Sequence, residues 1–339
     1  MSLVKSTAYA PDIYNALRGI LLVHKPVKIH FIDFTDQLKN KISSQLNEYE
    51  PRPLEKRLVI EGEQGDDKKL VEVPNLADHP LVVGPRYNPW EIRMAPLPPF
   101  LSYRSSGLQP FLIGDDIKYY LGKFRRRRFP CIYHITGRFG YCTDNMFSDG
   151  KIIDKATYKH IKAWKIDNAL SKIEVIQRDR LFDSAKVPLD SEEAYELAKS
   201  WPSTPPKMAN WPVLYRIRCI HLNLPEFKLE VVVINENEKY LAHLCQDIGV
   251  ALKSSAYTHS IRRVKHSMFD ISDCLTSSEW DLQSMINNLK IHADYKRVHS
   301  YLDSLDRASK VRTQHDPSQI ASKISQHGQD VMRATGGDM

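Results

Sequence analysis

Hydroxyl groups and one guanidinium make up most of the polar chemistry of residues 98–114, PPFLSYRSSGLQPFLIG. The side chains are those of Ser102, Tyr103, Arg104, Ser105 and Ser106, and no carboxylate occurs between residues 91 and 115. An alcohol is a weak nucleophile unless a base lies beside it. The segment by itself therefore offers hydrogen bonds and one positive charge. Its apolar second half predicts a buried, turn-rich loop that leads into a short strand.

The spacing within this segment resembles the catalytic loop of the TruB family of pseudouridine synthases. That signature has a leucine and an aspartate, a small residue with a glycine, apolar residues and a closing glycine. The matching residues here are Leu101-Ser102, Ser106-Gly107, Pro110 and Gly114. The family's aspartate therefore falls on Ser102.

Two more segments are similar to the same family. Residues 19–26, GILLVHKP, match its early run of aliphatic residues with a Lys-Pro pair. Residues 131–150 match a second motif without a gap at Tyr133, Phe139-Gly140, Thr143-Asp144 and Asp149-Gly150, with Cys131 in place of a lysine. Trp280-Asp281-Leu282 and Ser284 resemble the animal mitochondrial branch.

The resemblance implies a reaction and the residues that perform it. Such enzymes flip a uridine out of RNA; an aspartate participates covalently in breaking the glycosidic bond, a tyrosine stacks on the base, and an arginine pairs with the aspartate. No metal or organic cofactor takes part. The tyrosine corresponds to Tyr133, and the arginine position, two residues after Tyr240, is Ala242.

Both charged partners are thus replaced by small neutral residues. A buried arginine that lost its carboxylate would cost several kcal/mol, so loss of one partner favours loss of the other. The sequence therefore predicts an RNA-binding protein of this family with impaired or lost catalysis.

Basic residues are predicted to hold the RNA, in a chain whose formal net charge is +7. They are Lys25, Arg104, Arg125, Arg126, Arg127, Arg128, Arg262 and Arg263. Two plainer interpretations remain open. The run 125–128 is also compatible with a solvated loop, and Tyr133 is equally compatible with an ordinary core tyrosine.

Two other functions remain as alternatives. The first is an active tRNA or mRNA uridine-to-pseudouridine isomerase that uses a displaced carboxylate from Asp115, Asp116 or Asp144. The second is a basic scaffold subunit that docks on another protein without binding RNA. Retention of RNA that depends on salt distinguishes RNA binding from the scaffold role.

The fold class implied is α+β, a pseudouridine synthase fold with a mixed, mainly antiparallel central sheet flanked by helices. We expect a flexible N-terminus over 1–18, with some character of a targeting segment, one TruB-like domain over 19–306 with an insertion at about 50–90, and a disordered tail over 307–339. No C-terminal PUA domain is expected. The strand over 131–140 is expected to lack a single clean apolar face.

The cysteine content indicates a reducing compartment. Five scattered cysteines without a CxxC pair indicate neither a disulfide framework nor a zinc site, and no apolar run is long enough to span a membrane. The resemblance implies a mitochondrial protein. Its expected partners are mitochondrial mRNA, tRNA or rRNA, together with proteins of RNA processing or ribosome assembly.

Overall fold

The computed structural model describes residues 9–292 apart from residues 53, 62–68, 116, 127–128, 186 and 201–211. An eight-stranded sheet runs through the molecule in the order β1-β5-β11-β6-β10-β9, with β4 paired to β5 and β12 paired to β11. These strands are β1 (Gly19–Lys25), β4 (Met94–Pro96), β5 (Ser105–Ile113), β6 (Cys131–Phe139), β9 (Val213–Asn223), β10 (Glu226–Ile234), β11 (Ala256–His266) and β12 (Phe269–Asp270).

The strand pairs of this sheet are antiparallel except for β5 and β11, which run parallel. In that pair Ile261 lies opposite Ser105 and Arg263 lies opposite Gly107. The sheet is therefore mixed and mainly antiparallel, and with its helices it confirms the predicted α+β class.

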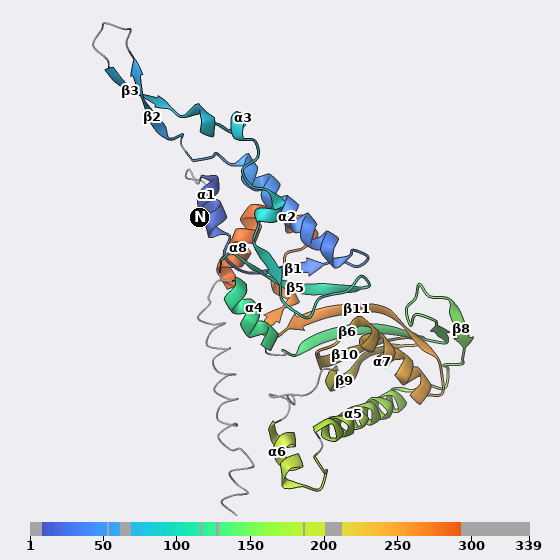
Figure 1. The fold of residues 1–339 in the computed structure, drawn as a ribbon. Coiled ribbons are helices and arrows are strands. Elements are labelled where there is room, and N and C mark those ends of the chain that lie inside the picture. Colours follow the sequence, from blue (N-terminus) through green and yellow to red (C-terminus); the bar gives the residue numbers. More distant parts are fainter. Residues whose placement is uncertain are drawn as a thin grey trace, which may run out of the picture.

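Helices cover the two ends of the sheet differently (Figure 1). On one face of β1 and β5 the core includes residues of α2 and α8, and on their other face it includes residues of α4. The third core cluster joins β6, β9, β10 and β11 to α5 and α7. The helices are α1 (Ala10–Ala16), α2 (Phe31–Glu48), α3 (Pro80–Val83), α4 (Ile117–Arg126), α5 (Ala163–Ala185), α6 (Glu192–Ser200), α7 (Glu238–Ala251) and α8 (Leu282–His292).

The spacing of apolar residues explains how helix α2 packs on the sheet. The side chains of Phe34, Leu38, Ile42 and Leu46 recur every four residues in α2, and all are fully buried. Such spacing places them on one stripe of the helix. This stripe packs against β1 and β5 and so supports the strand that follows the Ser102 loop.

Strand β6 corrects one sequence-based expectation. Its odd-numbered residues from Cys131 to Phe139 are all buried, while its even-numbered residues are exposed or half-buried. The expectation of no clean apolar face was therefore wrong. Cys131 and Gly137 complete the buried face of the strand. Gly137 is buried beneath the Phe227 ring, which lies where a Cβ on this residue would stand.

The N-terminal segment also differs from the flexible 1–18 that we expected. Residues 10–16 form α1, and Ile13 and Leu17 are buried in the same cluster as α2. Residues 1–8 and the expected tail 307–339 lie outside the described residues.

The insertion contains the expected hairpin, formed by β2 (Lys56–Glu61) and β3 (Lys69–Pro74). It extends away from the rest of the molecule (Figure 1). A second short hairpin, β7 (Tyr141–Thr143) with β8 (Ile152–Lys155), follows β6 and encloses the Thr143–Gly150 motif. In the part of the chain that the structure describes, no helix is long and apolar enough for a membrane span.

Candidate RNA-binding and catalytic site

Residues 98–104 form a loop before β5, and its main chain is held from several sides. Arg263 Nη1 donates a 2.7 Å hydrogen bond to the Pro99 carbonyl, and His266 Nε2 donates one of 2.9 Å to the Pro98 carbonyl. Burial lowers the pKa of His266 to about 3, so the ring is neutral. The amide of Leu101 donates to Gln109 Oε1. These contacts fix where Ser102 lies.

Lys25 fixes the same loop from β1. Its side chain is fully buried, and Nζ donates to the carbonyls of Pro26 and Ser102 at 3.0 Å and of Ser105 at 3.2 Å. Burial lowers the pKa of Lys25 to about 8, against the opposing attraction of Glu238. This lysine, predicted to contact RNA, is directed at the loop's carbonyls.

Arg263 is likewise fully buried. Besides the Pro99 carbonyl it donates through Nε to the Leu108 carbonyl at 2.7 Å and through Nη2 to Gln109 Oε1 at 2.8 Å. Its neighbour Arg262 points to the other face of β11 and is exposed. Of the predicted pair, Arg262 is therefore the one at the surface.

Two of the three predicted catalytic positions, Tyr133 and Ala242, belong to one large buried cluster, which also includes Leu101, the residue before Ser102. Ala242 is fully buried, and its carbonyl accepts a hydrogen bond from Thr258 Oγ1 at 3.2 Å. A methyl group thus lies at the expected arginine position, and Ser102, at the expected aspartate position, is half-buried.

A carboxylate that the sequence did not reveal lies beside Tyr133. The Tyr133 hydroxyl donates to Glu236 Oε1 at 2.5 Å, and Arg263 Nη1 lies 3.5 Å from the same hydroxyl. Glu236 is only 8% exposed, and within the described chain its Oε2 is buried without a hydrogen-bond partner. Burial raises the pKa of Glu236 and, well above its ordinary value, that of Tyr133.

Sequence reasoning missed Glu236 for an identifiable reason. It directly precedes Asn237, whose side chain accepts from the Tyr240 amide and caps α7. Acidic residues near a helix start usually face solvent and favour the helix dipole. Glu236 follows the end of β10 by two residues, and the pairing of β10 with β6 brings this part of the chain close to Tyr133.

Of the carboxylates proposed from sequence as displaced acids, Asp115 lies far from the Ser102 loop. Asp115 follows the far end of β5, roughly 26 Å of strand away from Ser105, and forms an ion pair with Arg93. Asp144 is exposed, and its Oδ1 accepts from the Lys151 amide. Asp116 is outside the described residues. The Asp115 suggestion is therefore wrong on geometry.

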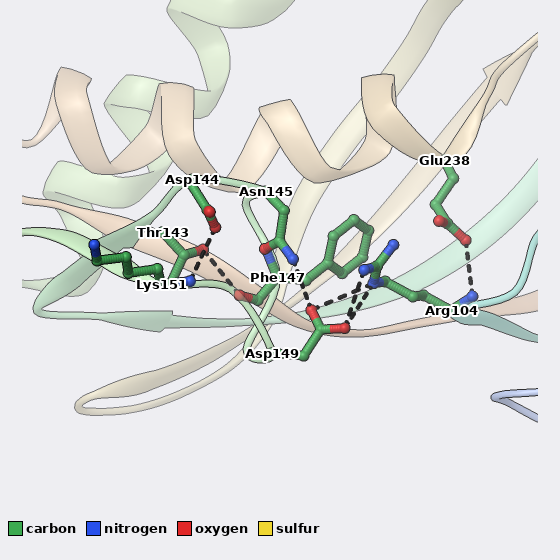
Figure 2. A network of polar contacts seen from close by, with 8 residues as sticks. All are labelled: Arg104, Thr143, Asp144, Asn145, Phe147, Asp149, Lys151 and Glu238. Carbon is green, nitrogen blue, oxygen red and sulfur yellow. Dashed lines mark hydrogen bonds and ion pairs between the residues drawn. The ribbon is translucent and has the colours of Figure 1, made fainter.

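Arg104 connects the Ser102 loop to the β7–β8 motif (Figure 2). Its Nη2 lies 3.0 Å from Asp149 Oδ2, and its Nε lies 3.1 Å from the same oxygen. The guanidinium carbon lies 4.9 Å from the centre of the Phe147 ring. The Arg104 amide donates to Glu238 Oε2, which also accepts from Ser105 Oγ.

The arginine run divides at the end of α4. Arg125 and Arg126 belong to the last turn of that helix, while Arg127 and Arg128 lie outside the described residues. Within the described chain no group of three or more His, Cys, Asp or Glu side chains is arranged to hold a metal ion.

The chain is an α+β protein in which the Ser102 loop lies next to a tyrosine-bearing strand, β6, and the N-terminal part of a helix, α7. It is 30% identical over 284 residues to the mitochondrial pseudouridylate synthase TRUB2 of Xenopus tropicalis, covering 82% of this chain and 86% of that protein. Identity to human mitochondrial TRUB2 is 28%, over 80% of this chain and 82% of that protein. The chain belongs to the TruB family of pseudouridine synthases, in its animal mitochondrial branch.

More distant comparisons are weaker. A tRNA pseudouridine synthase B of Borrelia garinii is 26% identical over 60% of this chain and 68% of its own length. A structure of a Cbf5-Nop10-Gar1 complex aligns with a TM-score of 0.44 at 11% identity, over 85% of this chain and 67% of that chain. A scan against protein-family models finds no match.

Proposed function

We propose that this protein binds uridine-containing RNA in mitochondrial RNA metabolism and has lost most or all pseudouridine synthase activity. The proposal is supported by the sequence resemblance, which assigns the positions of the family's aspartate and arginine to Ser102 and Ala242, and by the burial of Ala242, whose side chain is a methyl group. Neither the anion that attacks the nucleotide nor the cation that would pair with it is present at these two positions.

RNA binding rests on charge and on the family. The net charge of +7 favours association with a polyanion. Arg104 and Arg262 are the predicted cations that the structure places at or near the surface, and Arg125 to Arg128 add a basic run. The expected ligands are mitochondrial mRNA, tRNA or rRNA, and the expected partners are proteins of RNA processing or ribosome assembly. The mitochondrial location is inferred from the names of the TRUB2 relatives.

The test is a mapping of pseudouridine at base resolution after incubation of the purified protein with mitochondrial transcripts. We expect binding without stoichiometric conversion in the wild type. Conversion should appear in the Ser102→Asp, Ala242→Arg double variant, provided that circular dichroism shows it to be folded. Stoichiometric conversion by the wild-type protein would contradict the loss of catalysis.

A second function is supported by Glu236. A buried carboxylate with one free oxygen, bonded to the family's tyrosine and near a buried arginine, is an alternative displaced acid for a working isomerase. Under this alternative the wild type converts uridine, and Glu236→Gln abolishes conversion while RNA binding remains. Since Gln keeps the size and an acceptor oxygen, loss of conversion alone would point to the carboxylate's charge.

A further inference from the structure

Arg104 and Asp149 form an ion pair beside the Ser102 loop. Arg104 binds Asp149 Oδ2 through Nη2 at 3.0 Å and through Nε at 3.1 Å. The side chains are 36% and 55% exposed. The rigid fork of an arginine matches a carboxylate and a phosphate in the same way. A carboxylate in this position therefore occupies the place that a phosphate would take.

Arg104 is held in position without Asp149. Its guanidinium carbon lies 4.9 Å from the centre of the Phe147 ring, a stacking distance for a cation and an aromatic ring. Its amide is anchored to Glu238. Phe147 in turn is buried and forms a bridge to Thr258 of β11.

Asp149, by contrast, is free to be displaced. Besides Arg104, its carboxylate contacts the Asn145 side chain, which donates to Oδ1 at 2.9 Å. The ion pair lowers the pKa of Asp149, so the carboxylate is ionised at neutral pH. An exposed ion pair of this kind contributes little net stability. Exchange of its anion therefore costs little. The loop around Phe147 keeps the hydrogen bonds from Thr143 Oγ1 to the Phe147 carbonyl and from the Lys151 amide to Asp144, which do not involve Asp149 (Figure 2).

We propose that the Arg104 guanidinium is a binding site for an RNA phosphodiester, which takes the place of the Asp149 carboxylate when RNA binds. The site rests on the proposed RNA binding and defines one contact within it. Asp149 acts as an internal competitor for the cation. The site lies two residues from Ser102, so a phosphate bound there would hold the RNA next to the degenerate catalytic loop.

The experiment measures the dissociation constant of a fluorescein-labelled, uridine-containing RNA stem-loop by anisotropy at several salt concentrations. Asp149→Asn removes the competitor's charge and nearly keeps its shape, so we expect binding two- to five-fold tighter. Arg104→Gln should weaken binding and reduce the slope of log K against log salt by about 0.7–0.9. In the double variant Asp149→Asn should no longer tighten binding beyond the control.

The matched control is Glu72→Gln. Glu72 is 59% exposed and pairs with Lys56 at 3.0 Å in the β2–β3 hairpin. Its replacement by glutamine changes the net charge by the same amount as Asp149→Asn. Tightening by Asp149→Asn that does not exceed this control, or that persists in the Arg104→Gln background, would overturn the site. If the wild-type protein binds RNA and either of these results is found, the phosphate site is refuted and the proposed RNA-binding function still stands. Absence of RNA binding by the wild type and by Asp149→Asn would overturn both.

Discussion

A lysine that is buried completely holds the Ser102 loop to β1. Lys25 donates to three carbonyls, one in the loop at Ser102 and one at Ser105, the first residue of β5. Burying an ammonium is costly unless hydrogen bonds compensate for the lost water, and these three bonds are that compensation. Because the lowered pKa of about 8 shows that burial outweighs the opposing charge of Glu238, Lys25 is also a pH-sensitive element of the fold.

Replacing Lys25 by methionine tests this role. The substitution leaves three carbonyls without their donor, and we expect a loss of roughly 1–3 kcal/mol in the free energy of unfolding at pH 7. Between the folded pKa of about 8 and the ordinary value of 10.5, the unfolded chain binds more protons at residue 25 than the folded chain. The contribution of Lys25 to the free energy of unfolding therefore rises with pH between about 8 and 10.5.

The measurement is urea unfolding of both proteins at pH 7 and pH 9.5. The destabilisation caused by Lys25→Met should be larger at pH 9.5. An equal or smaller difference at the higher pH would mean that the lysine's pKa is not lowered by folding.

The sequence alone predicted the catalytic positions but not the side chains that surround them. The motif spacing led to Ser102, Tyr133 and Ala242, and two of these residues, Tyr133 and Ala242, belong to one large buried cluster. It did not reveal Glu236, because the strand pairing that turns this side chain toward Tyr133 joins residues about a hundred positions apart. Long-range pairing of this kind leaves no local pattern.

At the scale of elements, the parallel contact between β5 and β11 depends on Gly107. Its φ is +111°, and a Cβ there would stand 2.2 Å from the Arg263 carbonyl oxygen. Gly107 therefore satisfies two requirements at once, a backbone conformation that L side chains rarely adopt and close approach of the neighbouring strand. The same glycine was recognised from sequence only as a motif residue.

Substitution of Gly107 should separate the two strands. We expect Gly107→Ala to lower the free energy of unfolding by more than about 3 kcal/mol, because a backbone clash cannot be relieved by a rotamer change. Gly122→Ala, in α4, is the matched control: nothing lies within 4 Å of the added Cβ. Its helical position predicts stabilisation of about 0.5–1 kcal/mol.

Thermal and urea unfolding of both alanine variants provide the measurement. Similar small effects for the two glycines would show that β5 and β11 tolerate a wider separation than the structure indicates.

Element prediction succeeded where one face of an element is apolar. The stripe of α2 and the β9–β10 pair follow directly from their patterns. The strand β6 was described wrongly because its buried face includes Cys131 and Gly137, residue types that an apolar pattern does not count. Helix α1 was missed because residues 10–16 contribute few apolar side chains, and their burial depends on α2.

At the scale of the whole molecule, the β2–β3 hairpin stands apart from the body (Figure 1). On one of its faces Leu58, Ile60 and Leu70 are each more than 60% exposed. An element that buries so little surface adds little to the free energy of folding. The hairpin is thus an appendage of the domain rather than a part of its core.

Its removal is the corresponding test. Replacing residues 56–74 by a short Gly-Ser linker should leave the midpoint of thermal unfolding within about 4 °C of wild type, which corresponds to less than about 1 kcal/mol. The far-ultraviolet circular dichroism should lose only a small strand contribution. A large fall in the midpoint would mean that the hairpin packs against the body more closely than its exposure indicates.

The β5–β11 contact also bears on how the chain must be made. Strands separated by some 150 residues form this junction, and the loop and tyrosine of the candidate site lie on either side of it. A nascent or cleaved chain that ends before β11 would carry the edge of β5 uncovered, with main-chain donors and acceptors ready to pair with any other extended segment. For such a product the hazard is self-association, and completion of the chain through β11 is what removes it.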